Sequence, residues 1–172
     1  MNEYDCNLIV KNRFSFFNTF EYYRLNGRHD IPDQKGVYVV VMPNDFIVQF
    51  RPTTDGPDVY KSRNLVVAID ELEQNWVENS RILYIGMAGG ESHKLKDRIW
   101  EYVRYGYYKE DKIKGRTGCT NHRGGRYIWQ LESNKELLIG YTLWEDARIL
   151  ESVLIKQFEV KYKKKPFANL QR

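Results

Sequence analysis

Residues 36–42 (GVYVVVM) restrict the fold of this chain more than any other segment, because the run is almost entirely apolar and mostly β-branched. Such a run predicts a strand, and the turn-forming residues Pro43-Asn44-Asp45 end it. Residues 46–50 (FIVQF) follow and are predicted to pair with that strand as a hairpin. Residues 82–85, which run into a glycine-rich turn, and residues 137–142 predict two further short strands.

Helical patterns alternate with these strands along the chain. We expect helices over residues 14–25, 65–77, 94–105 and 145–162, and loops over 51–58 and 106–125. Strands and helices are therefore mixed. The fold class is predicted to be α+β, with a small mixed, largely antiparallel sheet flanked by helices.

The composition excludes several classes of protein. The chain has 172 residues, of which 15% are aromatic, and this apolar surface argues against disorder. No apolar run approaches the roughly 18 residues of a membrane span, and the first ten residues do not resemble a signal peptide. The length suits a single domain. Two cysteines, Cys6 and Cys119, cannot form a disulfide framework, so a cytoplasmic protein is expected.

Positive charge is concentrated in one part of the chain. The net charge is +4, but residues 94–127 hold ten basic and four acidic side chains, a local net charge of +6, interleaved with aromatic residues. Such a segment suits a nucleic acid, although a solvated surface with some tyrosines is the alternative. The predicted nucleic-acid-binding residues are Lys94, Lys96, Arg104, Lys112, Lys114, Arg116, His122, Arg123 and Arg126.

Two predicted helices carry polar residues in unusual places. In the last helix, Glu151 falls in the middle of the apolar stripe formed by residues 147, 150, 154, 155 and 158. A carboxylate aimed at a core must be paired, protonated or bound to a metal, so either a structural salt bridge or a functional carboxylate is expected. In the 94–105 helix, Arg98 and Tyr102 stand one turn apart beside the apolar stripe. They form either a structural pair or a guanidinium placed for a phosphate.

The order of these features resembles a known family. Gly36-Val37-Tyr38 on one strand, Tyr84-Ile85-Gly86 on another, Arg98 in the next helix and Glu151 in a later helix are similar to the GIY-YIG nucleases. Residues 150–156, followed by Pro166 and Asn169, resemble the end of that domain in bacterial excision-repair endonucleases. The resemblance spans residues 36–172, with an insertion at about 45–80 and an N-terminal helical extension over 1–35.

The resemblance implies metal-dependent hydrolysis of DNA phosphodiester bonds. Tyr38 and Tyr84 would flank the scissile phosphate and help to activate water, while Arg98 would stabilise the developing charge. Glu151 would ligate Mg²⁺ or Mn²⁺, and Asn169 would steady the site. Many family members have histidine where this chain has Tyr102. Some restriction-enzyme members have tyrosine there, so a phenol or phenolate could serve as general base through water. Which of the three tyrosines takes the proton stays open.

Other functions compete with the restriction-type or repair-type nuclease. A nucleic-acid-binding module that kept the fold without cleaving is the main alternative. A protein-interaction domain that uses the acidic residues 70–78 has only its charge in its favour. The 45–80 insertion is a suitable place for target recognition or for a homodimer contact.

Overall fold

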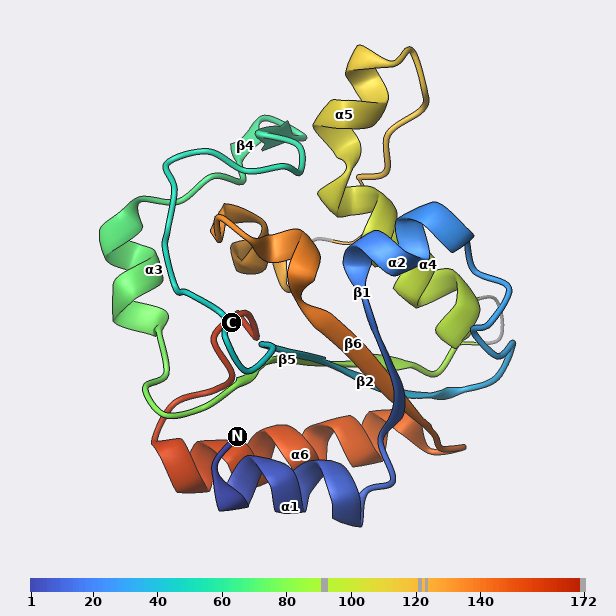
Figure 1. Ribbon diagram of the computed structural model, residues 1–172, viewed down its shortest axis with the longest axis vertical. Coiled ribbons are helices and arrows are strands. Elements are labelled where there is room, and N and C mark those ends of the chain that lie inside the picture. The colour runs from blue at the N-terminus through green and yellow to red at the C-terminus, as the bar shows by residue number, and fades with distance from the viewer. Residues whose placement is uncertain (91–92, 121, 123, 171–172) are drawn as a thin grey trace.

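A four-stranded sheet forms the centre of the computed structural model, which describes residues 1–90, 93–120, 122 and 124–170 (Figure 1). Its strands are β1 (Ser15–Thr19), β2 (Gly36–Val41), β5 (Ile82–Ala88) and β6 (Leu138–Leu143). The spatial order is β1-β6-β2-β5, and all three pairings are antiparallel. The α+β class predicted from the sequence is confirmed.

The strand β2 is central, as its composition requires. All six of its residues are buried, and it pairs along its length with β5 on one side and with β6 on the other. Both edges of β2 are therefore occupied, so the predicted hairpin between this strand and residues 46–50 is wrong. Within that segment, Phe50 forms only an isolated bridge with Leu131.

Helices cover both faces of the sheet (Figure 1). The helices α1 (Glu3–Lys11) and α6 (Ala147–Tyr162) pack on one face, where Val37 and Val39 share a core with Leu154. The helices α2 (Phe20–Asn26) and α4 (Leu95–Gly106) pack on the other face, around Tyr38 and Val40. Alternation along β2 thus sends its tyrosine into one core and the flanking valines into the other.

The N-terminal segment differs from the prediction. Residues 14–25 were expected to form one helix, but they divide into the edge strand β1 and the helix α2. Thr19 separates the two elements, because its backbone pairs with Leu138 of β6 while its hydroxyl accepts a hydrogen bond from the Tyr22 N–H at 2.9 Å. The segment 1–35, expected to be helical, therefore also contributes a strand to the main sheet.

The segment 45–80 holds a small hairpin of β3 (Val59–Tyr60) and β4 (Arg63–Asn64) and the helix α3 (Ile69–Asn75). The predicted helix over 65–77 is correct only in its middle. Residues 65–68 lie outside the helix, and the Gln130 side chain hydrogen-bonds both the N–H and the carbonyl of Val67, each at 3.0 Å.

The region 106–125 is not a continuous loop as predicted. It contains the helix α5 (Tyr108–Ile113), which follows directly after α4. Gly106 ends α4 against Trp129, where a Cβ atom would lie 2.2 Å from the indole ring. Two short 3₁₀ helices, η1 (Arg126–Gln130) and η2 (Asn134–Glu136), then lead the chain into β6.

Candidate active site

Two tyrosines from neighbouring strands meet on the α4 side of the sheet. Tyr38 of β2 lies opposite Gly86 of β5, and Tyr84 lies opposite Val40, so both phenol side chains project from the same face. Their ring centroids are 5.9 Å apart. A Cβ atom on Gly86 would lie 2.7 Å from Tyr38 Cζ and 2.6 Å from Tyr84 Cε1. Only glycine at position 86 leaves room for the two rings to converge.

The helix α4 adds a third phenol to this pair. The Tyr102 ring is 5.5 Å from the Tyr84 ring and 6.3 Å from the Tyr38 ring, measured between centroids. Tyr102 is fully buried, and its hydroxyl donates a hydrogen bond to the Gly125 carbonyl at 2.9 Å. This hydroxyl is therefore directed to the backbone that follows His122, and Tyr102 does not line a pocket that Glu151 lines.

A histidine completes the cluster of rings. His122 stacks on Tyr102 with centroids 4.0 Å apart, its Nε2 lies 2.6 Å from the Tyr38 hydroxyl, and its Nδ1 lies 2.9 Å from the Gly124 carbonyl. The imidazole is fully buried. The sequence suggested His122 as a nucleic-acid contact because it lies in the basic segment, but the structure places it among the tyrosines, away from the surface.

A pocket of about 650 Å³ opens beside this cluster, at the β5 edge of the sheet. Tyr84, Glu151 and Asn169 all line it, together with Arg126, Arg148 and Lys165. The C-terminal segment closes the strand edge here, because the Ala168 N–H donates to the Leu83 carbonyl at 2.8 Å. The Asn169 side chain accepts from the Ile85 N–H at 2.9 Å and donates to the Ile85 carbonyl at 2.7 Å. Asn169 thus fixes the pocket wall to β5.

Glu151 reaches this pocket from the opposite face of the sheet. Its neighbours in the stripe of α6, Leu150 and Leu154, are buried against the sheet, whereas Glu151 is half-buried and lines the pocket. The Glu151 carboxylate was predicted to point into a core, but it lies at the edge of that core, beside the edge strand β5. There it is close enough to raise the pKa of Tyr84 and of Tyr38 by its negative charge.

Burial controls the ionisation of the cluster. It raises the pKa of Tyr84 to about 12, with the Glu151 charge as a second cause, and it raises the pKa of Tyr38 well above the ordinary value of a phenol. The positive charge of Arg98 opposes both shifts. Burial, aided by Arg98, lowers the pKa of His122 to about 3. At neutral pH both phenols and the imidazole are therefore uncharged.

Arg98 carries the positive charge of the cluster from α4. It is half-buried, and its Nη1 donates to Glu101 Oε2 at 2.8 Å. Its effect on the pKa values of Tyr38, Tyr84 and His122 places its charge near all three side chains. The tyrosines, the arginine and the carboxylate chosen from the sequence thus lie around one site.

The predicted nucleic-acid contacts are more dispersed. Arg126 lines the pocket with Glu151, but Lys94 lies near Asp33, and Lys96 lines a different pocket. Four others lie on α4, on α5 or just after α5, and α5 stands at the end of the molecule opposite α6 (Figure 1). These four are Arg104, Lys112, Lys114 and Arg116. Arg123 lies outside the described residues.

Two cations of the pocket were not selected from the sequence. Arg148 stands three residues before Glu151 on α6, and Lys165 ends a run of three lysines. The i,i+3 spacing of Arg148 and Glu151 places both on one side of the helix, which was the available signal. Together with Arg126 they give the pocket three cations in addition to the Glu151 carboxylate.

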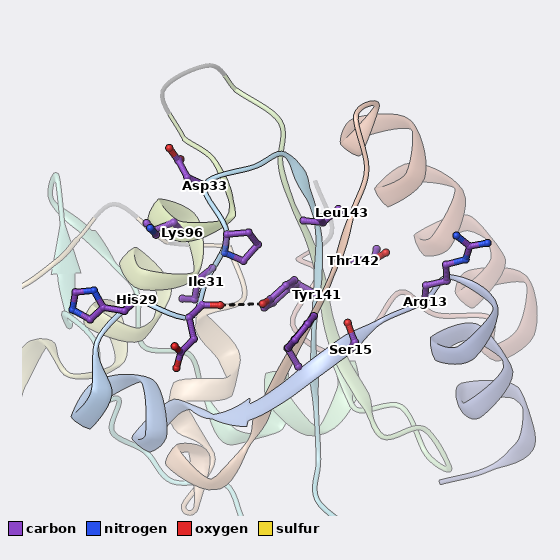
Figure 2. Close-up of a pocket in the computed structure, with 12 residues that line it drawn as sticks. Arg13, Ser15, His29, Ile31, Asp33, Lys96, Tyr141, Thr142 and Leu143 are labelled. Atoms are coloured by element: carbon purple, nitrogen blue, oxygen red, sulfur yellow. Dashed lines mark hydrogen bonds between the residues drawn. The ribbon is translucent and has the colours of Figure 1, made fainter.

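Figure 2 shows a second pocket of about 650 Å³ at the other edge of the sheet, where β1 pairs with β6. Tyr141 lines it and donates a hydrogen bond to the Asp30 carbonyl at 3.2 Å. Of the residues predicted to be functional, this pocket contains only Lys96. It is therefore separate from the tyrosine cluster, which lies on the β5 side.

A metal at the Glu151 pocket would depend on few protein ligands. Over the described ranges, no group of three or more His, Cys, Asp or Glu side chains is arranged to hold a metal ion. One carboxylate in a pocket open to solvent nevertheless fits Mg²⁺, which keeps several waters and is commonly held by one or two carboxylates plus substrate phosphates. Glu151 is the residue that would hold it.

Comparisons with models of protein families, with curated proteins and with solved structures give no match to this chain. In the part of the chain that the structure describes, no helix has the length and apolar character needed to cross a membrane.

Proposed function

We propose that this protein is a metal-dependent endonuclease that hydrolyses DNA phosphodiester bonds at the Glu151 pocket, in the manner of the GIY-YIG nucleases. The observation that carries the proposal is the convergence of Tyr38, Tyr84, Arg98 and Glu151 around one site. These residues are spread over more than 100 positions of the sequence and come from two strands and two helices. They were chosen from the order of their motifs, so their convergence supports that choice.

Each group suits an in-line attack of water on a phosphate. Tyr84 is the phenol that lines the pocket, so its hydroxyl can hold the attacking water, while Tyr38 lies buried behind it. Arg98 can stabilise the charge that develops on the phosphoryl oxygens. A divalent ion bound at Glu151 would supply Lewis-acid assistance to the leaving oxygen. Asn169 acts through the backbone of β5, which it holds at two atoms.

The three cations of the pocket supply the contacts to the DNA backbone. Arg126, Arg148 and Lys165 line the same pocket as Glu151, so a phosphate group that enters the pocket meets three positive charges. Lysine and arginine contacts to phosphates release counterions, and the affinity for DNA should therefore fall steeply with salt. The cations on and after α5 would contact the duplex farther from the cut.

Cleavage of a supercoiled plasmid with Mg²⁺ or Mn²⁺ tests the proposal. The wild-type protein should nick or linearise the plasmid, and Glu151→Gln should reduce the rate at least 100-fold, because removing one charge-stabilising group commonly costs 10²–10³. Glu159→Gln is the matched control, since Glu159 lies on the same helix but does not line the pocket. It should cleave at the wild-type rate.

Two results would contradict the proposal in different ways. If the wild type binds DNA but cuts it with neither metal, the protein is a non-cleaving nucleic-acid-binding module. If Glu151→Gln and wild type cut equally fast, cleavage occurs elsewhere and the site is misassigned.

A further inference from the structure

His122 is a buried polar side chain for which the proposed reaction has no role. It is the only ring of the cluster that comes from neither a strand nor a helix, yet it has no exposed surface. Both of its ring nitrogens are hydrogen-bonded, Nε2 to the Tyr38 hydroxyl at 2.6 Å and Nδ1 to the Gly124 carbonyl at 2.9 Å. Two partners on one buried imidazole determine which nitrogen carries the proton.

The Gly124 carbonyl decides the tautomer. A carbonyl oxygen can only accept a hydrogen bond, so Nδ1 of His122 carries the hydrogen and donates it. In a neutral imidazole Nε2 is then a bare acceptor, and the Tyr38 hydroxyl must donate to it. The depressed pKa of His122, caused mainly by burial, keeps the ring in this neutral form at neutral pH.

Tyr38 connects His122 to the tyrosine that lines the pocket. Tyr38 has a single hydroxyl hydrogen, and His122 receives it. With that hydrogen bond made, the Tyr38 ring is held beside Tyr84, at 5.9 Å between the ring centroids. Tyr84 lines the pocket, so the position of Tyr38 determines the surface against which the Tyr84 phenol packs.

Tyr102 holds the imidazole in this orientation. Its ring stacks on His122 with an interplanar angle of 14°, and its hydroxyl donates to the Gly125 carbonyl at 2.9 Å. Gly125 has a φ of 74°, and a Cβ atom there would lie 2.2 Å from the Tyr102 hydroxyl oxygen. The phenol and the backbone that carries His122 are thus fitted closely to each other.

We propose that His122 is a positioning residue of the nuclease site: its bare Nε2 takes the hydrogen of Tyr38, and this holds the Tyr38 phenol beside Tyr84, the phenol that lines the pocket. The inference rests on the proposed function. His122 touches neither DNA nor the reacting atoms, and it keeps its proton throughout. It acts through Tyr38, and Tyr102 acts through His122.

Two substitutions separate the acceptor from the ring. His122→Phe keeps an aromatic ring that can stack on Tyr102 but removes the acceptor, whereas His122→Gln loses the ring and keeps an oxygen that can accept from Tyr38. Single-turnover and steady-state cleavage of plasmid DNA with Mg²⁺ should show kcat at least tenfold lower for His122→Phe, because misplaced reacting groups lose rates of up to about 10²-fold. KM should stay within twofold. His122→Gln should retain at least one third of the wild-type kcat.

A double substitution tests the route through Tyr38. In a Tyr38→Phe background, His122→Phe should cause no further loss, because its partner hydroxyl is already absent. His29→Gln, which changes an exposed histidine, should leave kcat unchanged. Circular dichroism shows which variants are folded, and His122→Gln and Tyr38→Phe remain informative if His122→Phe does not fold.

Each outcome is decisive. Wild-type kcat in His122→Phe, with Glu151→Gln inactive, would overturn the role of His122 and leave the nuclease proposal standing. Loss in His122→Gln with full activity in His122→Phe would show that only the stacked ring matters and would also overturn it. A wild type that never cleaves would remove the proposed function and this role with it. Independently of cleavage, ¹⁵N NMR of the imidazole should show hydrogen on Nδ1 at pH 7, and hydrogen on Nε2 would refute the inference.

Discussion

The stability of the protein should fall in mild acid because of one side chain, His122. In the unfolded chain its imidazole protonates near the ordinary pKa of 6.5, whereas burial lowers the pKa in the folded protein to about 3. Between these values the unfolded state binds the proton and the folded state does not. Stability that is present above pH 6.5 is therefore lost as the pH falls toward 3.

The magnitude follows from the two pKa values. From pH 7.5 to pH 5.0 the folded imidazole stays neutral while the unfolded one becomes charged, which lowers the free energy of unfolding by about 2 kcal/mol. The full burial of His122 means that solvent does not screen this term. His122→Gln removes the titrating group, so this part of the pH dependence should disappear with it.

Urea unfolding followed by tryptophan fluorescence at the two pH values measures the effect. The wild type should lose about 2 kcal/mol more than His122→Gln between pH 7.5 and 5.0, whatever the absolute stability of the variant. His29→Gln, at an exposed position, should lose as much as the wild type. Equal losses in wild type and His122→Gln would refute the burial of a neutral imidazole and the hydrogen-bond direction derived from it.

Three further changes test other parts of the structure. Gly86→Ala would force a Cβ atom to within 2.8 Å of the rings of Tyr38 and Tyr84, so urea unfolding should show a loss of about 1–3 kcal/mol in stability. Gly90→Ala is the control and should cause no such loss, because a Cβ atom there would lie 3.8 Å from the His93 nitrogen, an ordinary contact. Asp5→Ala should lower the free energy of unfolding by about 3 kcal/mol in the same assay, because this buried carboxylate accepts hydrogen bonds from a backbone N–H, a serine and a tyrosine. Asp45→Ala, at an exposed position, should leave the stability unchanged. Arg148→Ala should reduce the slope of log K against log salt by about 0.9 in DNA titrations followed by fluorescence anisotropy, and an unchanged slope would place the DNA elsewhere.

Much of the fold could be predicted because local pattern and tertiary environment agree. The apolar run of β2, the stripe of α6 and the helix α4 each bury the side that their periodicity indicates. Glu151 could also be identified from the pattern, because a carboxylate in an apolar stripe is unfavourable to bury unless the helix loses its contact with the sheet at that residue. In the structure Glu151 lies beside the edge strand β5, where the pocket begins.

Other elements depend on partners distant in the sequence. Residues 46–50 have the composition of a strand, but β5 and β6 already occupy both edges of β2. Phe14 to Leu25 has helical composition, yet pairing with β6 draws its first half into the sheet. The expected helix starts only after residue 68, and the backbone of Val67 is hydrogen-bonded instead to a glutamine side chain more than 60 positions away. Local propensity has no information about such pairings, so the sequence alone could not predict them.

The role of His122 could not be predicted for a related reason. In the sequence it lies in a basic segment, which favours a surface contact, and Tyr102 stands where many of the GIY-YIG nucleases that the sequence resembles have histidine. The structure relates these two observations. The Tyr102 ring stacks on the His122 imidazole, and the Tyr102 hydroxyl donates a hydrogen bond to the Gly125 carbonyl. By stacking on His122, Tyr102 of α4 holds the imidazole where its Nε2 meets the Tyr38 hydroxyl. The tyrosine at position 102 and the burial of His122 are therefore one structural feature. Tyr102→His on its own should disturb the cluster, because it removes the hydroxyl that holds Gly125.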